Sequence, residues 1–359
     1  MRRTIFEAEH DAFREVIRAF LLKEAVPHVV EWERAGMIPS SFWERAAENG
    51  FVGFEAPEAM GGAGVHDFRF NAIIDEEVAY TGAVGDNFTM QNDILTPYLL
   101  DLTNDEQKAR WLPDFTAGRL IAAIAMSEPG AGSDLQAMRA RARRDGDDYV
   151  LDGTKTFVTS GIAADLIIVA ARTDPAGGRQ GFSLFAVERG MEGFERGRKL
   201  EKAGRWAQDT AELFFNDVRI PAANRLGEEG EGFAYLMRNL PRERLSMAVS
   251  AVAAAEHALE ITLAYVKERT AFGQPIGSFQ FNRLALAELV TKTSAARTYV
   301  DRCITAVNDG DLTPSEAAGA KAWTTDLQNE VVDRCLQLHG GYGYMAEYEV
   351  SRLWRDARV

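Results

Sequence analysis

The chain has 359 residues, of which 46% are hydrophobic and 26% charged, and its formal net charge is −14. A chain of this length is too long for one small core, so we expect two or three domains with the composition of a globular enzyme. The acidic charge argues against a nucleic-acid partner, because such a partner needs a basic face. No apolar run approaches the roughly 20 residues that span a bilayer, so we expect no membrane partner.

The cysteines and the N-terminus indicate the compartment. Cys303 and Cys335 lie in helix-like segments and are expected to be reduced, buried side chains. The first residues, MRRTIFE, lack the long apolar stretch of a signal peptide. We therefore predict a cytoplasmic protein.

Residues 1–119 have the pattern of a helical domain. Capping boxes, in which a side chain at each end of the first turn satisfies a free N–H group, are expected where Ser or Thr precedes Glu by three residues. The pairs are Thr4 with Glu7, Ser41 with Glu44, and Thr103 with Glu106. Gly50 is placed to end the helix that starts near Ser41.

Residues 120–224 change to short apolar strands separated by Gly, Asp and Pro. The expected strands are 120–126, 149–151, 154–159, 166–171, 182–187 and 213–215. Asp152-Gly153 is a favoured two-residue turn, so 149–161 predicts a hairpin. Strands at this spacing, with no helical pattern between them, favour an antiparallel β-barrel or sandwich and argue against a parallel βαβ sheet.

The loop 127–134, SEPGAGSD, follows the first of these strands. Its glycines would let backbone N–H groups approach a flat or anionic ligand over the sheet edge, although an ordinary Gly-rich loop has the same composition. The loop is not a dinucleotide fingerprint, because Gly130 and Gly132 lack the third glycine at the required spacing.

Residues 225–359 are helical again, and Thr313, Pro314 and Glu316 predict a capped helix start. Glu243 lies in the segment LPRER, where Pro241 marks a local irregularity of the helix. If Glu243 faces an apolar channel, burial would raise its pKa toward the range of a general base. Taken alone, the segment also fits a surface glutamate balanced by Arg242 and Arg244.

Segments along the whole chain resemble the acyl-CoA dehydrogenase family in the expected order. They are 127–134, 149–161, 202–210 (KAGRWAQDT), 240–244, 269–273 (RTAFG) and 337–343 (QLHGGYG). The long-chain subgroup is the most similar, because its base lies in a Glu-Arg-Leu context like that of Glu243. The resemblance implies an α+β fold: an N-terminal α-helical domain (1–119), a middle antiparallel β-barrel (120–224) and a C-terminal helical bundle (225–359) without its last helix.

The resemblance also implies the reaction and its partners. It is the FAD-dependent α,β-dehydrogenation of an acyl-CoA to the trans-2-enoyl-CoA, with Glu243 taking the α proton. Electrons would pass to an electron-transfer flavoprotein, and the chain would form a homo-oligomer, a dimer or a tetramer. The family normally continues past Val359 through a further loop and helix, without which we expect weaker FAD retention.

Site residues carry over from the resemblance position by position. FAD contacts are expected from Ile124, Met126, Ser127, Gly132, Ser133, Phe157, Val158 and Thr159, and across a subunit interface from Arg269, Gln280, Gln337, Leu338, His339, Gly340 and Gly341. Substrate contacts are expected from Ser133, Pro241, Arg242 and Arg244. Each has a plainer reading: Arg269 could stabilise a helix C-terminus, Gln280 could be solvated, and His339 could be a turn residue. No metal site is expected, because His339 has no partner at metal-ligand spacing.

Two other functions keep the fold but change the chemistry. A related flavin oxidase would reoxidise with oxygen, or act on another acyl carrier or a nitroalkane; an Asp in place of Glu243 would favour the nitroalkane. A non-catalytic acyl-CoA-binding subunit would have lost its base, and Glu243 argues against it.

Overall fold

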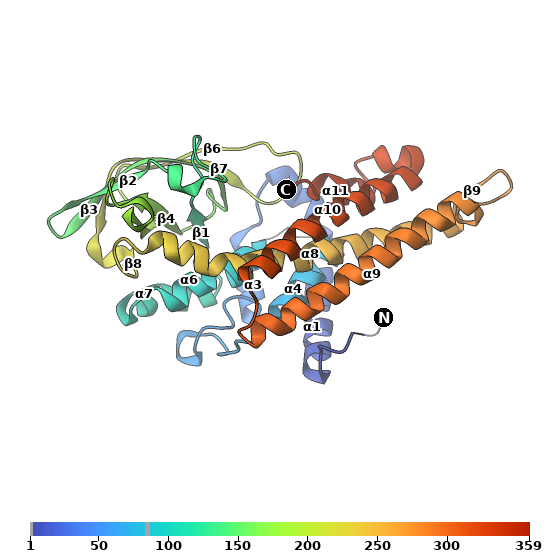
Figure 1. Cartoon of the computed structure of the whole chain (residues 1–359), viewed down its shortest axis with the longest axis horizontal. Coiled ribbons are helices and arrows are strands. Elements are labelled where there is room, and N and C mark those ends of the chain that lie inside the picture. The colour runs from blue at the N-terminus through green and yellow to red at the C-terminus, as the bar shows by residue number, and fades with distance from the viewer. Residues whose placement is uncertain (1–2, 83–86) are drawn as a thin grey trace.

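The computed structural model describes residues 3–82 and 87–359, in which a helical region, a sheet and a second helical region follow one another (Figure 1). The first helical region contains α1 (Ala8–Glu24), α2 (Val29–Ala35), α3 (Ser40–Glu48), α4 (Phe68–Thr81), α5 (Asn87–Thr89), the π-helix η3 (Met90–Leu95), α6 (Thr96–Asp101) and α7 (Asp105–Thr116). α4 packs against both α1 and α8, which couples the two helical regions.

Two of the expected capping boxes in this region are wrong. α1 begins after Glu7, whose side chain and backbone N–H pair with His10, so Thr4 is not the cap. α3 is preceded by Pro39, and Ser41 lies inside the helix. Glu7 and Pro39 are the residues with the extended backbone that an N-cap requires.

The remaining helix-end predictions come closer. The box of α7 is shifted by one residue, to Asn104 and Gln107, which exchange bonds of 2.9 Å. α3 ends at Glu48, and Gly50 follows with φ of +74°. The box formed by Thr313 and Glu316 is confirmed at the start of α10.

The middle region is a mixed, open sheet, so the expected closed antiparallel barrel is wrong. Its strands are β1 (Ala122–Ala125), β2 (Arg141–Asp145), β3 (Asp148–Thr159), β4 (Leu166–Arg172), β5 (Phe182–Glu188), β6 (Phe194–Lys199), β7 (Thr210–Pro221) and β8 (Arg225–Leu226). Their order is β6-β7-β3-β2-β4-β5-β8, and β1 pairs with β4. The β1–β4 pairing is parallel, and β6 and β8 stand at opposite ends of the path instead of pairing with each other.

The hairpin expected at Asp152-Gly153 is also wrong. The turn comes earlier, where Asp145 pairs with Asp148 around Gly146, and β3 continues without a break through Gly153. Gly153 has φ of +148° and coincides with a register shift against β7. A β-bulge and a tight turn both favour glycine with positive φ, so the local sequence does not distinguish them.

The C-terminal region is built on long helices. They are α8 (Gly232–Glu268), α9 (Gln280–Asn308), α10 (Pro314–Leu338) and α11 (Glu349–Asp356), with a short hairpin of β9 (Thr270–Ala271) and β10 (Gln274–Pro275) after α8. α8 runs from the sheet through the helical region to the β9 hairpin, with α9 returning beside it (Figure 1). Cys303 and Cys335 are buried and unbridged, as predicted.

By length and composition alone α8 could cross a membrane, since one window has a mean hydropathy of 1.3. The sequence expectation that no stretch of this kind exists was therefore too strong. In the protein, 61% of that window is buried, as in a core helix. Leu245, Val249 and Val252 of this stretch belong to the core shared with α9 and α10.

Candidate active site

Glu243 lies in the first part of α8 and is only 9% exposed, so the alternative of a surface glutamate is wrong. α8 begins at Gly232, which places Pro241 inside the helix. Because proline has no N–H group, the helical hydrogen bond to the carbonyl four residues earlier is lost just before Glu243. The carboxyl therefore sits on a helix that is both buried and locally irregular.

The surroundings of Glu243 favour its protonated form. Burial raises the pKa of Glu243 to about 7, and the Tyr98 hydrogen bond and the Arg244 charge lower it less. The Tyr98 hydroxyl, from α6, donates to Glu243 Oε1 across 3.4 Å. Within residues 3–82 and 87–359 Glu243 forms no ion pair; the nearby ion pairs of α8 involve Arg238 and Arg242 instead.

The two arginines beside Glu243 differ in their contacts. Arg242 binds the carboxylate of Glu55 through both terminal nitrogens, and its guanidinium lies 5.4 Å from the ring centre of Phe68. Arg244 is half-buried, and its charge lowers the pKa of Glu243. Arg242 is thus already engaged by a buried acid, whereas Arg244 acts on Glu243.

The loop 127–134 is held against β3 by a buried ion pair. Lys155 Nζ, fully buried on β3, lies 2.8 Å from Glu128 Oε1 and donates to the Met126 carbonyl. The Glu128 carboxylate also accepts from the N–H groups of Arg139 and Ala140. Ser127 accepts from the Thr156 N–H, while Gly132 and Ser133 stay exposed at the tip. The hydrogen-bonded start of the loop therefore carries an exposed, glycine-rich tip that follows β1 and its residue Ile124.

A cavity of about 630 Å³ is lined by Phe157 and Thr159 of β3, whereas Val158 is buried. The other expected contacts of this region, Ile124, Met126, Ser127, Gly132 and Ser133, are not among the residues that line it. Phe157 has φ of +58° and is 72% exposed. A bulky residue rarely adopts this backbone, so the ring is held outward at a strained position. Further lining residues, many of them basic, are Arg198, Leu200, Glu201, Lys202, Ala203, Gly204, Arg205, Gln208, Thr210, Arg355, Asp356, Arg358 and Val359.

A second cavity, of about 470 Å³, gathers most of the other expected contacts. Arg269, Leu338, His339, Gly340 and Gly341 line it together with Tyr265, Ile276, Tyr342 and Met345. His339 stacks on Tyr265 at 4.3 Å and donates Nδ1–H to the Cys335 carbonyl. Burial lowers its pKa. Gln337 and Gln280 are exposed and lie outside this lining. The two cavities share no residue.

Family models match three consecutive parts of the chain. They describe the acyl-CoA dehydrogenase N-terminal domain over residues 7–119, the middle domain over 123–218 and the C-terminal domain over 230–359. The chain belongs to the acyl-CoA dehydrogenase family. The chain is therefore an oxidoreductase of a family of FAD-binding enzymes that act in fatty acid β-oxidation.

Individual relatives place it near the long-chain enzymes. It is 48% identical to the long-chain specific acyl-CoA dehydrogenase of Sus scrofa and 47% identical to that of Mus musculus, covering 99% of this chain and 83% of each relative. An acyl-CoA dehydrogenase structure from Geobacillus kaustophilus matches with a TM-score of 0.97 and 48% identity, over 99% of this chain and 93% of that one. A glutaryl-CoA dehydrogenase from Mycobacterium smegmatis, 26% identical with a TM-score of 0.91, is in complex with FADH2, over 98% of this chain and 90% of that one.

The residues of this acyl-CoA dehydrogenase fit FAD at the first cavity. The exposed Phe157 ring offers a flat apolar surface to an isoalloxazine ring. Lys202 and Arg198 bring positive charge to the same cavity, as a pyrophosphate requires. When bound, FAD supplies the hydride acceptor that protein side chains lack.

Sequence reasoning missed the groups that set the chemistry of Glu243. Tyr98 is 145 positions away and carries no motif of its own. Glu55, which engages Arg242, is 187 positions away. Lys155, which is fully buried against Glu128, stands between Thr154 and Thr156, so its neighbours in the sequence did not indicate its burial.

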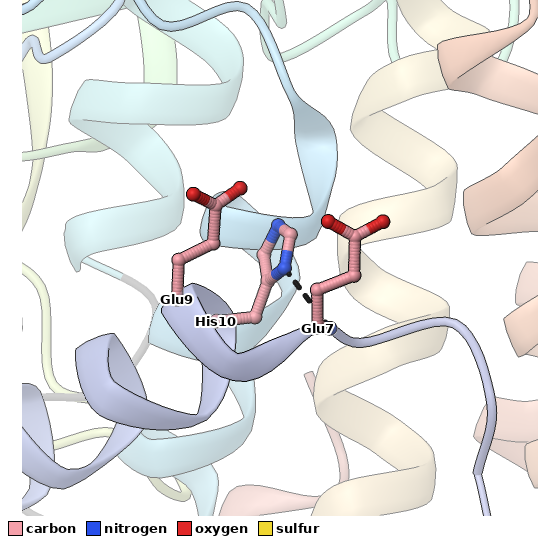
Figure 2. Close-up of side chains that lie close together, drawn as sticks. All are labelled: Glu7, Glu9 and His10. Atoms are coloured by element: carbon pink, nitrogen blue, oxygen red, sulfur yellow. Dashed lines mark hydrogen bonds between the residues drawn. The ribbon is translucent and has the colours of Figure 1, made fainter.

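One group of acids and a histidine has the spacing of a metal site but serves as a helix cap. Glu7, Glu9 and His10 offer ligand atoms within 4.8 Å of one another. Figure 2 shows His10 turned toward Glu7, whose backbone N–H donates to Nδ1 across 3.2 Å. The other ring nitrogen, Nε2, lies 3.2 Å from Asp67 Oδ2. Both ring nitrogens are therefore occupied, which leaves His10 no lone pair for a cation.

Proposed function

We propose that this chain removes the α proton of an acyl-CoA thioester with Glu243, forming the trans-2-enoyl-CoA while the β hydride leaves to FAD. The carrying observation is the buried carboxyl of Glu243, which forms no ion pair within residues 3–82 and 87–359 and whose pKa burial raises to about 7. A base is most effective when its pKa is near the working pH. The long-chain enzymes among the relatives support a long-chain acyl-CoA as the substrate.

Tyr98 and Pro241 would position this base. The Tyr98 hydroxyl donates to Glu243 Oε1, which leaves Oε2 as the oxygen that takes the proton. Pro241, two residues before the base, removes one of the hydrogen bonds of the helix, and with Arg244 it would line the substrate's path. Arg242, the residue before the base, would be held in position by its ion pair with Glu55.

We assign the flavin contacts to two surfaces. The first is the sheet edge, with Ile124, Met126, Ser127, Gly132, Ser133, Phe157, Val158 and Thr159. Ser133 at the loop tip would also meet the substrate. The second, with Arg269, Gln280 and residues 337–341, would reach the FAD of a neighbouring subunit, because its cavity is separate from the first. This arrangement requires a dimer or a tetramer, with an electron-transfer flavoprotein as the acceptor. The units 1–119, 120–224 and 225–359 would be its domains.

The visible spectrum of the purified, FAD-loaded protein tests this proposal. Anaerobic addition of a long-chain acyl-CoA should bleach the flavin band, and addition of an electron-transfer flavoprotein should restore it. Bleaching followed by rapid reoxidation in air alone would indicate a flavin oxidase. A flavin band unchanged by any acyl-CoA would overturn the proposal and support a non-catalytic acyl-CoA-binding subunit.

A further inference from the structure

A polar cluster is buried between α4, η3, α8 and the loop before α4. It consists of Glu55, Asn71, Asp75, Asp93 and Arg242, and its acids and amide are 1–5% exposed. Asn71 Nδ2 donates to Glu55 Oε1 (3.2 Å) and to Asp93 Oδ1 (2.5 Å). Arg242 in turn binds Glu55. Such polar density is unusual in an interior formed by apolar helix faces.

The cluster lies directly beside the proposed base. Arg242 precedes Glu243, and Ser246, which interacts with Asp93, follows it by three residues. Positions three apart share one face of a helix about 5 Å apart along its axis. On the other side, Tyr98, which bonds Glu243, follows Asp93 by five residues. If the α carbon of an acyl chain meets Glu243, the part of that chain that runs past Arg242 and Ser246 is the part that can reach the cluster.

The cluster has unused hydrogen-bonding capacity. Asn71 Oδ1, Asp93 Oδ2 and Arg242 Nε are buried and find no hydrogen-bond partner within residues 3–82 and 87–359. Burial raises the pKa of Asp93, and the Asn71 Oδ1 and Arg242 Nε atoms beside it stay without a partner in the described part of the chain. Protein interiors rarely leave such groups unpaired, and each exception calls for an occupant or a reason.

The segment that presents Asp93 is held in place on both sides. The Gln91 side chain exchanges two 3.0 Å bonds with the backbone of Ala122 on β1. The Asn92 side chain bonds the backbone of Phe51 and Gly53 at 2.9 Å. Asp93 directly follows these two residues in the same π-helical segment. Such segments are rare overall but are often found at functional sites. The cluster is therefore preorganised, as a binding subsite needs to be.

We propose that this cluster binds a hydroxyl group on the acyl chain, so that the preferred substrate is a hydroxylated acyl-CoA and not a plain hydrocarbon chain. This inference rests on the proposed function of Glu243. An alcohol can donate to Asn71 Oδ1 or Asp93 and accept from Arg242 Nε–H. A terminal carboxylate is disfavoured, because three acids already face a single arginine. A plain hydrocarbon chain would leave Asn71 Oδ1 and the Arg242 Nε–H without a hydrogen bond. A site with such buried polar groups discriminates strongly between a ligand that bonds them and one that does not.

Binding to the Glu243→Gln variant, which cannot turn over the ligand, tests the preference directly. Calorimetry on the FAD-loaded variant would compare acyl-CoAs of equal length that end in a methyl, a hydroxyl or a carboxylate, with the hydroxyl also placed at successive carbons beyond the β carbon. We expect one hydroxylated ligand to bind roughly tenfold or more tighter than the plain chain. Equal binding, or tighter binding of the plain or carboxylate chain, would overturn the inference.

Substitutions in the cluster test whether it causes the preference. In the same background, Asp93→Leu should abolish the hydroxyl preference, and the milder Ser246→Ala should reduce it; Glu260→Gln, at an exposed position of α8, should leave it unchanged. If both cluster variants fold, judged by thermal unfolding, and keep the preference, the inference is wrong. Bleaching of wild-type flavin separates the two hypotheses: no bleaching by any acyl-CoA defeats the proposed function, whereas bleaching with the plain chain preferred defeats only the hydroxyl site.

Discussion

Glu243 and Glu76 are both buried glutamates on core helices, but their surroundings are opposite. Glu76, 1% exposed on α4, lies within 2.8 Å of nitrogens from Arg3, Arg14 and Arg297. Burial alone would raise its pKa, but the three charges lower it. Glu243 has a tyrosine hydroxyl and no ion pair within the part of the chain that the structure describes, and its pKa rises to about 7. Burial with full charge pairing keeps a carboxyl ionised, whereas burial without it raises the carboxyl pKa toward the range of a general base.

The ion pairs of Glu76 also join the two helical regions. Arg3 precedes α1, Arg14 lies on α1 and Arg297 on α9, so Glu76 connects segments that are far apart in sequence. Arg3 also binds Asp301, and Arg297 also binds Glu256. α4 also packs on α8, the helix that carries Glu243.

The largest expected effect is on chemistry at Glu243. Glu243→Gln should slow flavin bleaching by acyl-CoA by about three orders of magnitude, because the amide cannot accept the α proton. Stopped-flow absorbance measures the rate, and the flavin content should equal that of the wild type. Glu260→Gln is the matched control on the same helix. Bleaching at the wild-type rate would contradict the assignment of the base.

The reciprocal variant should affect stability and spare chemistry. Glu76→Gln leaves Arg3, Arg14 and Arg297 without their common partner and should cost about 3–5 kcal/mol of unfolding free energy. Denaturant unfolding measures this loss, with the exposed Glu288→Gln as control. The bleaching rate per bound flavin should stay the same. A large loss of that rate in folded protein would mean that the two regions are not separable.

The pH dependence of stability should distinguish Glu243 from a paired acid. Burial raises the pKa of Glu243 from 4.5 to about 7. The contribution of its protonated carboxyl to the free energy of unfolding is therefore fully present below pH 4.5 and is lost as the pH rises through about 7. Glu243→Gln cannot ionise and should therefore exceed the wild type in stability by about 3 kcal/mol above this range. Below pH 4.5 the two proteins should be alike. Unfolding curves across pH measure this difference, and parallel curves would refute the raised pKa.

The smallest expected effect concerns Tyr98. Its hydroxyl lowers the pKa of Glu243, so Tyr98→Phe should raise that pKa. Because the base must be ionised, the rising limb of bleaching rate against pH should move to higher pH, by less than about one unit. Rates at high pH should change little. A limb that stays in place would show that the hydroxyl only fills space.

The local sequence predicted an element correctly where its residue pattern is typical of a single structure. β4 and β5, built from apolar runs, lie where the pattern predicted them, and the Thr313 cap is satisfied as expected. The local sequence did not decide the structure where the same residue type is favoured in two different structures. Gly153 suits a bulge as well as a turn, and Asn104 caps α7 as well as Thr103 could have done. The mixed, open form of the sheet includes the parallel β1–β4 pairing, which no short segment specifies.

By itself the sequence determined the family, the order of helical and strand regions, and Glu243 as the acid to examine, because motif spacing and periodicity are local properties. Only the tertiary structure decided that Glu243 is buried, that Arg242 is engaged by Glu55, and that Tyr98 reaches the carboxyl. These contacts join residues more than a hundred positions apart. A pKa depends on the burial and charge that such contacts create, so the chemistry of the site follows from packing.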